Sequence, residues 1–105
     1  MKSTDLISIH DLPRQEILEI LDLAARLKAQ PEAYHESLAN RTLAMIFEKP
    51  SLRTRVSFEA GMTQLGGHAI YLGPSDISMG KRESVHDIAR TLSGMADGIM
   101  ARTFS

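Results

Sequence analysis

The sequence predicts an α/β fold, a three-layer structure in which helices cover both faces of a parallel sheet. The chain has 105 residues, of which 43% are hydrophobic and 24% charged, as is ordinary for one globular domain. Helical and strand-like patterns alternate along it in the order helix, strand, helix, strand, helix, strand. Such alternation is typical of parallel strands joined by right-handed crossovers through helices.

The first helix is expected to begin after Asp11, which we predict to be its N-cap because a proline follows two residues later. Apolar residues then recur at helical spacing as far as Leu27. The helix is expected to end near Gln30, where another proline follows. Residues 31–40 are polar and predict a connection between this helix and the first strand.

Residues 43–47 form an apolar run that predicts a buried strand. A second helix is expected over residues 53–65, ended by the glycine pair at 66–67. Residues 69–72 predict a short second strand. The stretch 73–83 is rich in glycine, proline, serine and charge, and it predicts a long loop.

The third helix is expected to start at Ser84, which could form a capping box with Asp87. Its predicted apolar face consists of Val85, Ile88, Ala89, Leu92 and Met95. A third strand is expected over residues 99–101, and we expect Met100 in the core together with Met95. Because a doubly wound domain normally continues after such a strand, we expect the chain ending at Ser105 to be the first part of a larger protein or a truncated form of one.

Composition excludes several classes of function. The net charge of -1 argues against a nucleic-acid partner, and the absence of cysteine excludes disulfides and thiolate metal sites. The four histidines are scattered without metal-ligand spacing, and neither a Walker A loop nor a dinucleotide-binding glycine turn is present. We therefore expect no metal and no cofactor. No segment resembles a signal peptide or a membrane span, which predicts a soluble cytoplasmic protein without a membrane partner.

Hydroxyl and guanidinium groups gather where the first strand gives way to the second helix, at Ser51, Arg53, Thr54 and Arg55. A helix start favours an anion, because its backbone N–H groups are unpaired and its dipole end is positive. Ligands of parallel sheets bind beyond the carboxyl ends of the strands, and Arg102 follows the third strand. We therefore expect Arg53 and Arg102 to approach one phosphate-like anion from two directions.

Arg55 has a second interpretation, in which it forms a surface ion pair with Glu59 four residues later. The sequence alone leaves the two interpretations of Arg55 open. The charge distribution favours a small anionic ligand, since residues 1–40 are acidic on balance and residues 41–105 basic.

The run Phe-Glu-Lys-Pro-Ser-Leu-Arg-Thr-Arg-Val-Ser-Phe-Glu at residues 47–59 closely resembles the carbamoyl-phosphate motif of the aspartate/ornithine carbamoyltransferase family. Residues 64–67, the loop at 80–83 and the ending at 97–104 also stand in the family's order, so the resemblance covers essentially the whole chain. The Phe-Glu-Lys before Pro50 and the Arg-Thr-Phe at the end resemble the ornithine branch, since the aspartate branch usually has Arg-His-Pro at the latter place.

The resemblance implies roles for five residues. Ser51, Arg53 and Thr54, with the backbone around Leu52, would hold the phosphate of carbamoyl phosphate, and Arg102 would bridge the phosphate and the carbamoyl oxygen. Arg53 and Arg102 would be the catalytic residues. The implied reaction is attack by the δ-amino group of L-ornithine on the carbamoyl carbon, which gives citrulline and phosphate without a metal or a cofactor.

The resemblance also implies a homotrimer in which the 78–82 loop reaches a neighbouring subunit's active site. Ser78 stands where ornithine enzymes often carry glutamine and where the aspartate branch has serine, so it leaves the branch open. Lys81 and Arg82 could serve the neighbour's anion or could simply be solvated. Leu52 replaces a threonine found in many members, a small change if the backbone N–H does the binding.

By this resemblance, residues 1–105 are the N-terminal carbamoyl-phosphate-binding domain, an incomplete N-terminal half of the family's two-domain fold. The chain lacks the family's His-Pro-x-Gln segment and the second, ornithine-binding domain. We expect this fragment alone to be inactive. The alternatives are an aspartate or acyl-ornithine carbamoyltransferase, and a non-catalytic phosphate-binding or assembly module.

Overall fold

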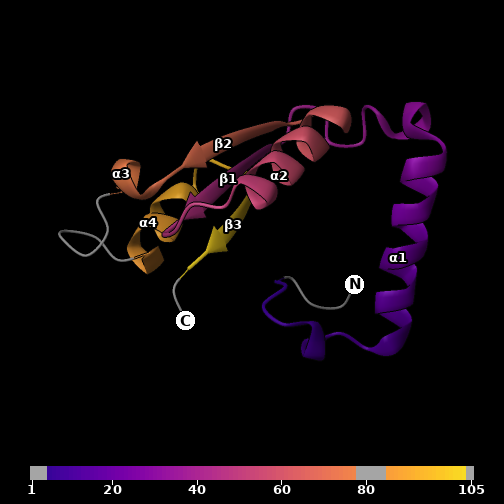
Figure 1. Ribbon diagram of the computed structural model, residues 1–105, viewed down its shortest axis with the longest axis horizontal. Coiled ribbons are helices and arrows are strands. Elements are labelled where there is room, and N and C mark those ends of the chain that lie inside the picture. The colour runs from indigo at the N-terminus through magenta and orange to yellow at the C-terminus, as the bar shows by residue number, and fades with distance from the viewer. Residues whose placement is uncertain (1–4, 78–84, 104–105) are drawn as a thin grey trace. The chain divides into compact units, whose positions relative to one another are not determined.

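The structure is a computed structural model that describes residues 5–77 and 85–103. The chain divides into two compact units, Met1–Tyr34 and His35–Ser105. The first unit is helical, and the second contains the sheet (Figure 1).

The first unit contains a short 3-10 helix η1 (Ile9–Asp11), the long helix α1 (Arg14–Ala29) and a second 3-10 helix η2 (Pro31–Tyr34). The predicted cap at Asp11 is wrong, because Asp11 closes the η1 turn by donating its N–H to Ser8 O at 3.0 Å. Pro13 occupies the N-cap position of α1 instead, without a side-chain cap. The expected end of the helix near Gln30 is confirmed, whereas η2 was not predicted.

Three strands form the sheet of the second unit: β1 (Thr42–Phe47), β2 (His68–Leu72) and β3 (Gly98–Arg102). All pairs are parallel, and the order β2-β1-β3 places β1 in the centre. The predicted burial of the first strand is confirmed, because Met45, Ile46 and Phe47 are fully buried. The parallel sheet predicted from the alternation of elements is thus present.

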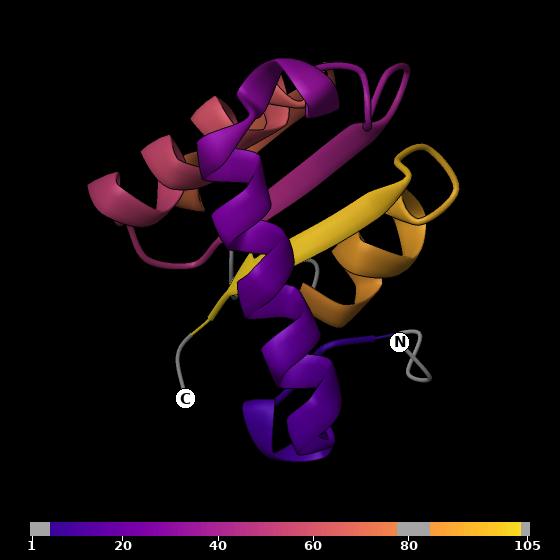
Figure 2. The same cartoon turned by 90° about the vertical axis from the view of Figure 1, so that its right-hand side faces the viewer.

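Helices α2 (Leu52–Gln64) and α4 (Val85–Leu92) cover opposite faces of the sheet, as predicted (Figure 2). Ile46 on β1 packs against Ile88 of α4, with the partly buried Leu72, Ala89, Leu92 and Ile99 around them. The next residue of β1, Phe47, points to the other face because strand side chains alternate. There the Phe47 ring lies 5.2 Å from the Tyr71 ring, over which Arg55 of α2 is placed.

Two predictions at the edges of these elements are wrong. The expected loop after β2 begins with a short helix α3 (Pro74–Ile77), formed where the Asp76 carboxylate accepts a 2.8 Å hydrogen bond from Gly73 N. Met95 is 78% exposed rather than in the core, because α4 ends at Leu92 and the chain then turns away from the helix face. The predicted start at Ser84 lies outside the described residues.

The predicted stop of α2 is confirmed by a hydrogen-bonded glycine turn. Gly66 has a φ of 86°. Its N–H donates to Thr63 O at 3.1 Å, while Gly67 N donates to Met62 O at 2.7 Å. These two bonds satisfy carbonyls that the end of a helix would otherwise leave unpaired.

The amino ends of β1 and β3 are joined through Asp97, which precedes β3. Its carboxylate accepts hydrogen bonds from Thr42 N at 2.8 Å and from the Arg41 guanidinium at 3.3 Å. These hydrogen bonds lower the pKa of Asp97, and the bond from the Thr42 backbone has the larger effect. The candidate site lies at the opposite ends of the same two strands.

Candidate anion-binding site

The first turn of α2 follows the carboxyl end of the central strand, after a connection of only four residues, 48–51. Ser51 is the N-cap, with extended backbone, and its carbonyl accepts the first intrahelical bond from Arg55 N at 3.0 Å. The backbone N–H groups of residues 52–54 therefore have no partner within the helix. Together with the positive end of the helix dipole they form a group of donors suited to an anion.

Two hydroxyl groups stand beside these backbone donors. Ser51 Oγ donates to Thr54 Oγ1 at 3.0 Å, and both side chains are partly buried. The Ser51 hydroxyl makes no side-chain cap bond to the helix backbone. The hydroxyl pair thus lies on the first turn next to the N–H groups, and the Ser51 hydroxyl accepts a hydrogen bond from none of them.

Arg102, the last residue of β3, lies on the same face of the sheet as α2. It is paired in register with Phe47, and its carbonyl accepts a 2.9 Å hydrogen bond from Glu48 N. Paired residues of parallel neighbours point to the same side, so Arg102 shares the Phe47 face. Register therefore places Arg102 beside the connection that leads into α2.

The Arg102 guanidinium has a buried donor that the described part of the chain leaves unpaired. Its Nε is shielded from solvent and has no hydrogen-bond partner among residues 5–77 and 85–103. An unpaired buried donor is costly, and native proteins rarely keep one without a ligand, a water or a functional reason. The Nε–H of Arg102 is thus a donor that an acceptor atom on a ligand could satisfy.

The two arginines of α2 have different surroundings. The Arg55 Nε donates to Glu59 Oε2 at 2.5 Å, which confirms the ion-pair interpretation. The same hydrogen bond raises the pKa of Arg55. Arg53 is exposed on the first turn, and no ion pair joins it to another described residue. Arg53 is therefore the arginine available to a ligand.

The predicted site residues fall into two groups. Ser51, Leu52, Arg53 and Thr54 lie together on one turn, and Arg102 lies at the end of the strand next to the one that leads into this turn. Their predicted roles toward a ligand stay predictions. The three residues predicted to serve a neighbouring subunit, Ser78, Lys81 and Arg82, lie outside the described residues.

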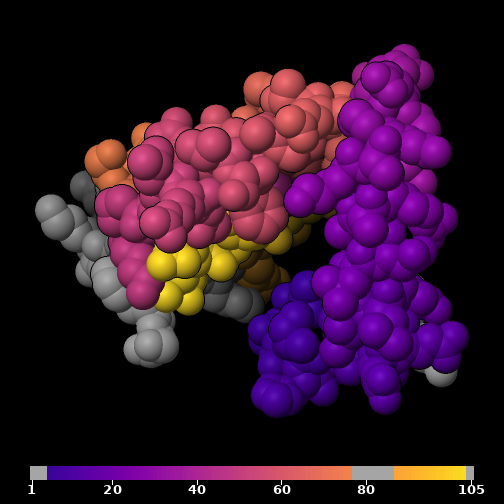
Figure 3. All heavy atoms as spheres, turned by 45° about the vertical axis from the view of Figure 1, so that its right-hand side comes forward, coloured from indigo at the N-terminus to yellow at the C-terminus, as the bar shows by residue number. Residues whose placement is uncertain are grey.

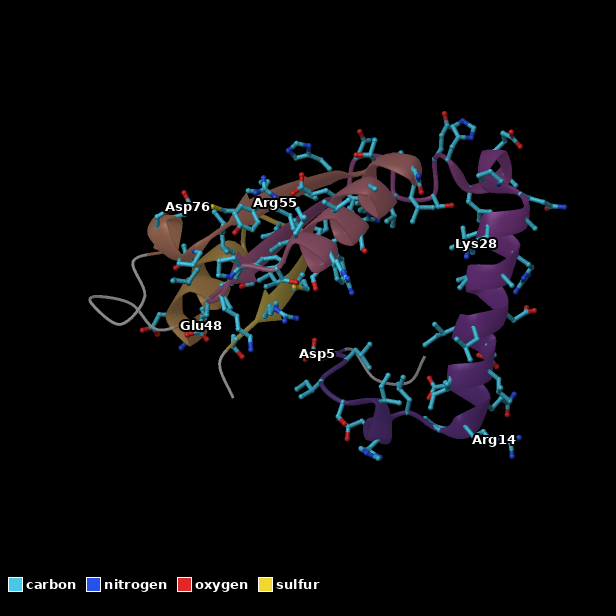
Figure 4. The ribbon with its side chains drawn as sticks, viewed as in Figure 1. Asp5, Arg14, Lys28, Glu48, Arg55 and Asp76 are labelled. Atoms are coloured by element: carbon cyan, nitrogen blue, oxygen red, sulfur yellow. The ribbon has the colours of Figure 1, made fainter. Side chains whose placement is uncertain are left out.

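Sequence reasoning missed Tyr71, which contacts both α2 and the central strand. Its ring lies beneath the Arg55 guanidinium and beside Phe47, as described above. No local pattern marks a strand tyrosine for such a contact, because the contact depends on the register between β2 and β1. The position of Arg55 relative to the strands can be followed in Figure 4.

Such an arrangement of donors suits chemistry on a phosphate compound. Guanidinium and backbone N–H groups stabilise negative charge on phosphate oxygens, and a guanidinium can also polarise a carbonyl. Among the described residues no group of histidine, aspartate or glutamate side chains could hold a metal ion. No helix in that part of the chain is long and apolar enough to cross a membrane.

Comparison with known proteins decides the family. The family model described as "Aspartate/ornithine carbamoyltransferase, carbamoyl-P binding domain" matches residues 4–105. This chain belongs to the aspartate/ornithine carbamoyltransferase family. The resemblance drawn from the 47–59 motif is thereby confirmed.

Relatives within the carbamoyltransferase family are close in sequence and in structure. An ornithine carbamoyltransferase of Methanosarcina acetivorans is 54% identical over 103 residues, which are 96% of this chain and 34% of that protein. The structure of the Pyrococcus furiosus ornithine carbamoyltransferase superposes with a TM-score of 0.88 at 46% identity, over 96% of this chain and 33% of that one. The catalytic subunit of M. jannaschii aspartate transcarbamoylase gives 0.87 at 40% identity, over 98% and 35%. The chain thus spans about a third of the length of the carbamoyltransferases it matches.

Proposed function

We propose that this chain is the carbamoyl-phosphate-binding part of an ornithine carbamoyltransferase. The complete enzyme would transfer the carbamoyl group to the δ-amino group of L-ornithine, giving citrulline and phosphate. The observation that carries the proposal is the buried Nε of Arg102, which has no partner among the described residues and lies on the face of the sheet where α2 begins. The relatives named ornithine carbamoyltransferase support it further.

The proposed roles follow from the donors available. The backbone N–H groups around Leu52, the hydroxyls of Ser51 and Thr54, and the Arg53 guanidinium would surround the phosphate. Arg102 would donate to the phosphate and to the carbamoyl oxygen at once, as its forked guanidinium allows. Catalysis would then consist of holding two reactants in line, polarising the carbonyl and stabilising charge on the departing phosphate. None of these effects needs a nucleophilic side chain.

The acceptor amine would be held by the part of the enzyme that this chain does not contain, since the relatives are about three times as long. Two other acceptors are the runners-up: aspartate, supported by the aspartate transcarbamoylase among the structural neighbours, and an acylated ornithine. Initial rates of the full enzyme with each of the three amines would separate them. A rate with ornithine no higher than with the other two would refute the ornithine assignment.

The proposal extends to assembly and location. We expect a cytoplasmic homotrimer in which Ser78, Lys81 and Arg82 complete a neighbouring subunit's site. Sedimentation of the full enzyme tests the assembly. A non-catalytic phosphate-binding or assembly module remains the alternative from another class, and it predicts anion binding without any transfer to an amine.

Titration with carbamoyl phosphate tests the site directly. Each charge-assisted hydrogen bond is worth roughly 1.5–3 kcal/mol, so Arg53→Ala and Arg102→Ala should each weaken binding about tenfold or more. Arg26→Ala is the matched control, because Arg26 is a helical arginine in an exposed ion pair with Asp22 on α1. If both site variants bind as tightly as the parent, the site assignment is wrong.

A further inference from the structure

We propose that Arg55 is a positioning residue of this site: stacked on Tyr71, it holds the first turn of α2 and its anion donors against the sheet. This inference rests on the proposed function of that turn as the carbamoyl-phosphate site. It assigns to Arg55 no contact with the ligand.

Among the described residues, helix α2 packs on the sheet through partly buried side chains only. None of its thirteen residues is buried. Leu52 in its first turn is 78% exposed and Val56 in the next is 53% exposed. The outer side of the helix is open to solvent in the space-filling view (Figure 3). A helix without buried side chains is weakly fixed by the hydrophobic effect, so individual contacts to the sheet matter more.

Arg55 provides such a contact. Its guanidinium carbon lies 3.9 Å from the centroid of the Tyr71 ring, within the range of a cation–π interaction. Glu59, one turn further along α2, accepts its Nε hydrogen bond at 2.5 Å and so fixes the orientation of the planar group over the ring. The negative charge of Asp76 also acts on Arg55 from α3.

Tyr71 is itself held in place beneath Arg55. Its ring contacts the Phe47 ring with centroids 5.2 Å apart and planes tilted by 48°. The backbone of Gly73 closes another side, since a Cβ there would come within 2.9 Å of the Tyr71 ring. Neighbouring atoms therefore restrict where the ring can move. Arg55 is thus stacked on a support that is well defined.

The same contacts connect the two halves of the anion site. Phe47 is fully buried, lies beside Tyr71 and is paired in register with Arg102. A continuous series therefore runs from Arg55 through Tyr71 and Phe47 to Arg102, across the α2 face of the sheet. Loosening its first contact would let the donors of the α2 turn move relative to the Arg102 guanidinium, and an anion held by both would bind less tightly.

The test is a double-mutant cycle on affinity for carbamoyl phosphate, measured by calorimetry on folded protein well below each thermal midpoint. Arg55→Met and Tyr71→Leu should each weaken binding about two- to fivefold, the range of an exposed cation–π contact. The double variant should bind carbamoyl phosphate no more weakly than the single variant with the lower affinity, because each single substitution already removes the same contact. Tyr71→Phe keeps the aromatic face beneath Arg55 and should therefore bind with parent affinity. Arg26→Met, which breaks a comparable ion pair on α1, should leave binding unchanged.

Three results would overturn the positioning role. Losses that multiply in the double variant would mean that Arg55 and Tyr71 act independently. If Tyr71→Leu keeps parent affinity while Arg55→Met binds more weakly, Arg55 contacts carbamoyl phosphate directly. If Arg55→Met lowers the thermal midpoint but keeps parent affinity, the contact contributes to stability and not to binding. Because Arg55 is exposed, this variant can be tested even if Tyr71→Leu does not fold. Failure of the proposed function is separate, since it would appear as parent affinity in both Arg53→Ala and Arg102→Ala.

Discussion

Phe47 and Arg102 lie opposite each other on neighbouring parallel strands, and the residue after Phe47 donates its backbone N–H to the Arg102 carbonyl at 2.9 Å. The connection from β1 into α2 therefore starts from a point that is bonded to the end of β3. The donors of the α2 turn and the Arg102 guanidinium share this anchor. The candidate site is built on the two strand ends rather than on a free loop, which favours a stable geometry.

Arg102→Met is expected to separate stability from binding. It removes a buried Nε–H that lacks a partner in the described structure, so the ligand-free variant should be as stable as the parent or more stable. It should also lose the rise in thermal midpoint that carbamoyl phosphate gives the parent. Thermal unfolding with and without ligand measures both effects. A destabilised variant that still responds to the ligand would contradict the assignment of Arg102 as an unsatisfied ligand-binding group.

Gly66→Ala is expected to destabilise the protein. Left-handed backbone costs a residue with a Cβ about 1–2 kcal/mol. The φ of Gly66 is 86°, and the new Cβ would approach the His35 carbonyl to 2.5 Å, which adds a steric cost. Denaturant unfolding measures the loss.

Gly61→Ala is the matched control for this glycine. Gly61 lies inside α2, and a Cβ there meets nothing within 4 Å. Alanine should therefore stabilise the helix by roughly 0.5–1 kcal/mol. Equal effects of the two substitutions would mean that the turn at the end of α2 does not constrain the chain as described.

Much of the fold could be predicted from local pattern, since the apolar run of β1 and the glycine pair after α2 each identify an element. Met95 shows the limit of that reasoning. Its spacing fits the α4 face, but the helix ends three residues earlier, at Leu92. The site divides in the same way. Its first-turn residues are contiguous and could be identified from a motif, whereas the support of Arg55 by Tyr71 requires strand register, which single-strand patterns do not encode.

Asp97 should make stability depend on pH in the acid range. Its pKa is lowered in the folded chain, chiefly by the Thr42 backbone hydrogen bond and also by Arg41. The carboxylate therefore contributes stability fully above the unfolded pKa of about 3.9, and loses it as pH falls through the lower folded value. Asp97→Asn should flatten the unfolding free energy against pH over this acid window, and Arg41→Gln should flatten it in part. An unchanged acid slope in Asp97→Asn would show that other groups control it.

Residues 1–105 alone are expected to bind carbamoyl phosphate without forming citrulline. The candidate site accounts for one substrate, and the related ornithine carbamoyltransferases are about three times as long. Without a site for the amine, the advantage of holding both reactants in line is lost, and that advantage supplies roughly 7–11 kcal/mol of barrier lowering in well-oriented systems. A citrulline assay with purified protein, beside a ligand titration of the same sample, measures both properties. Citrulline above the uncatalysed background would show that these residues already contain an acceptor site.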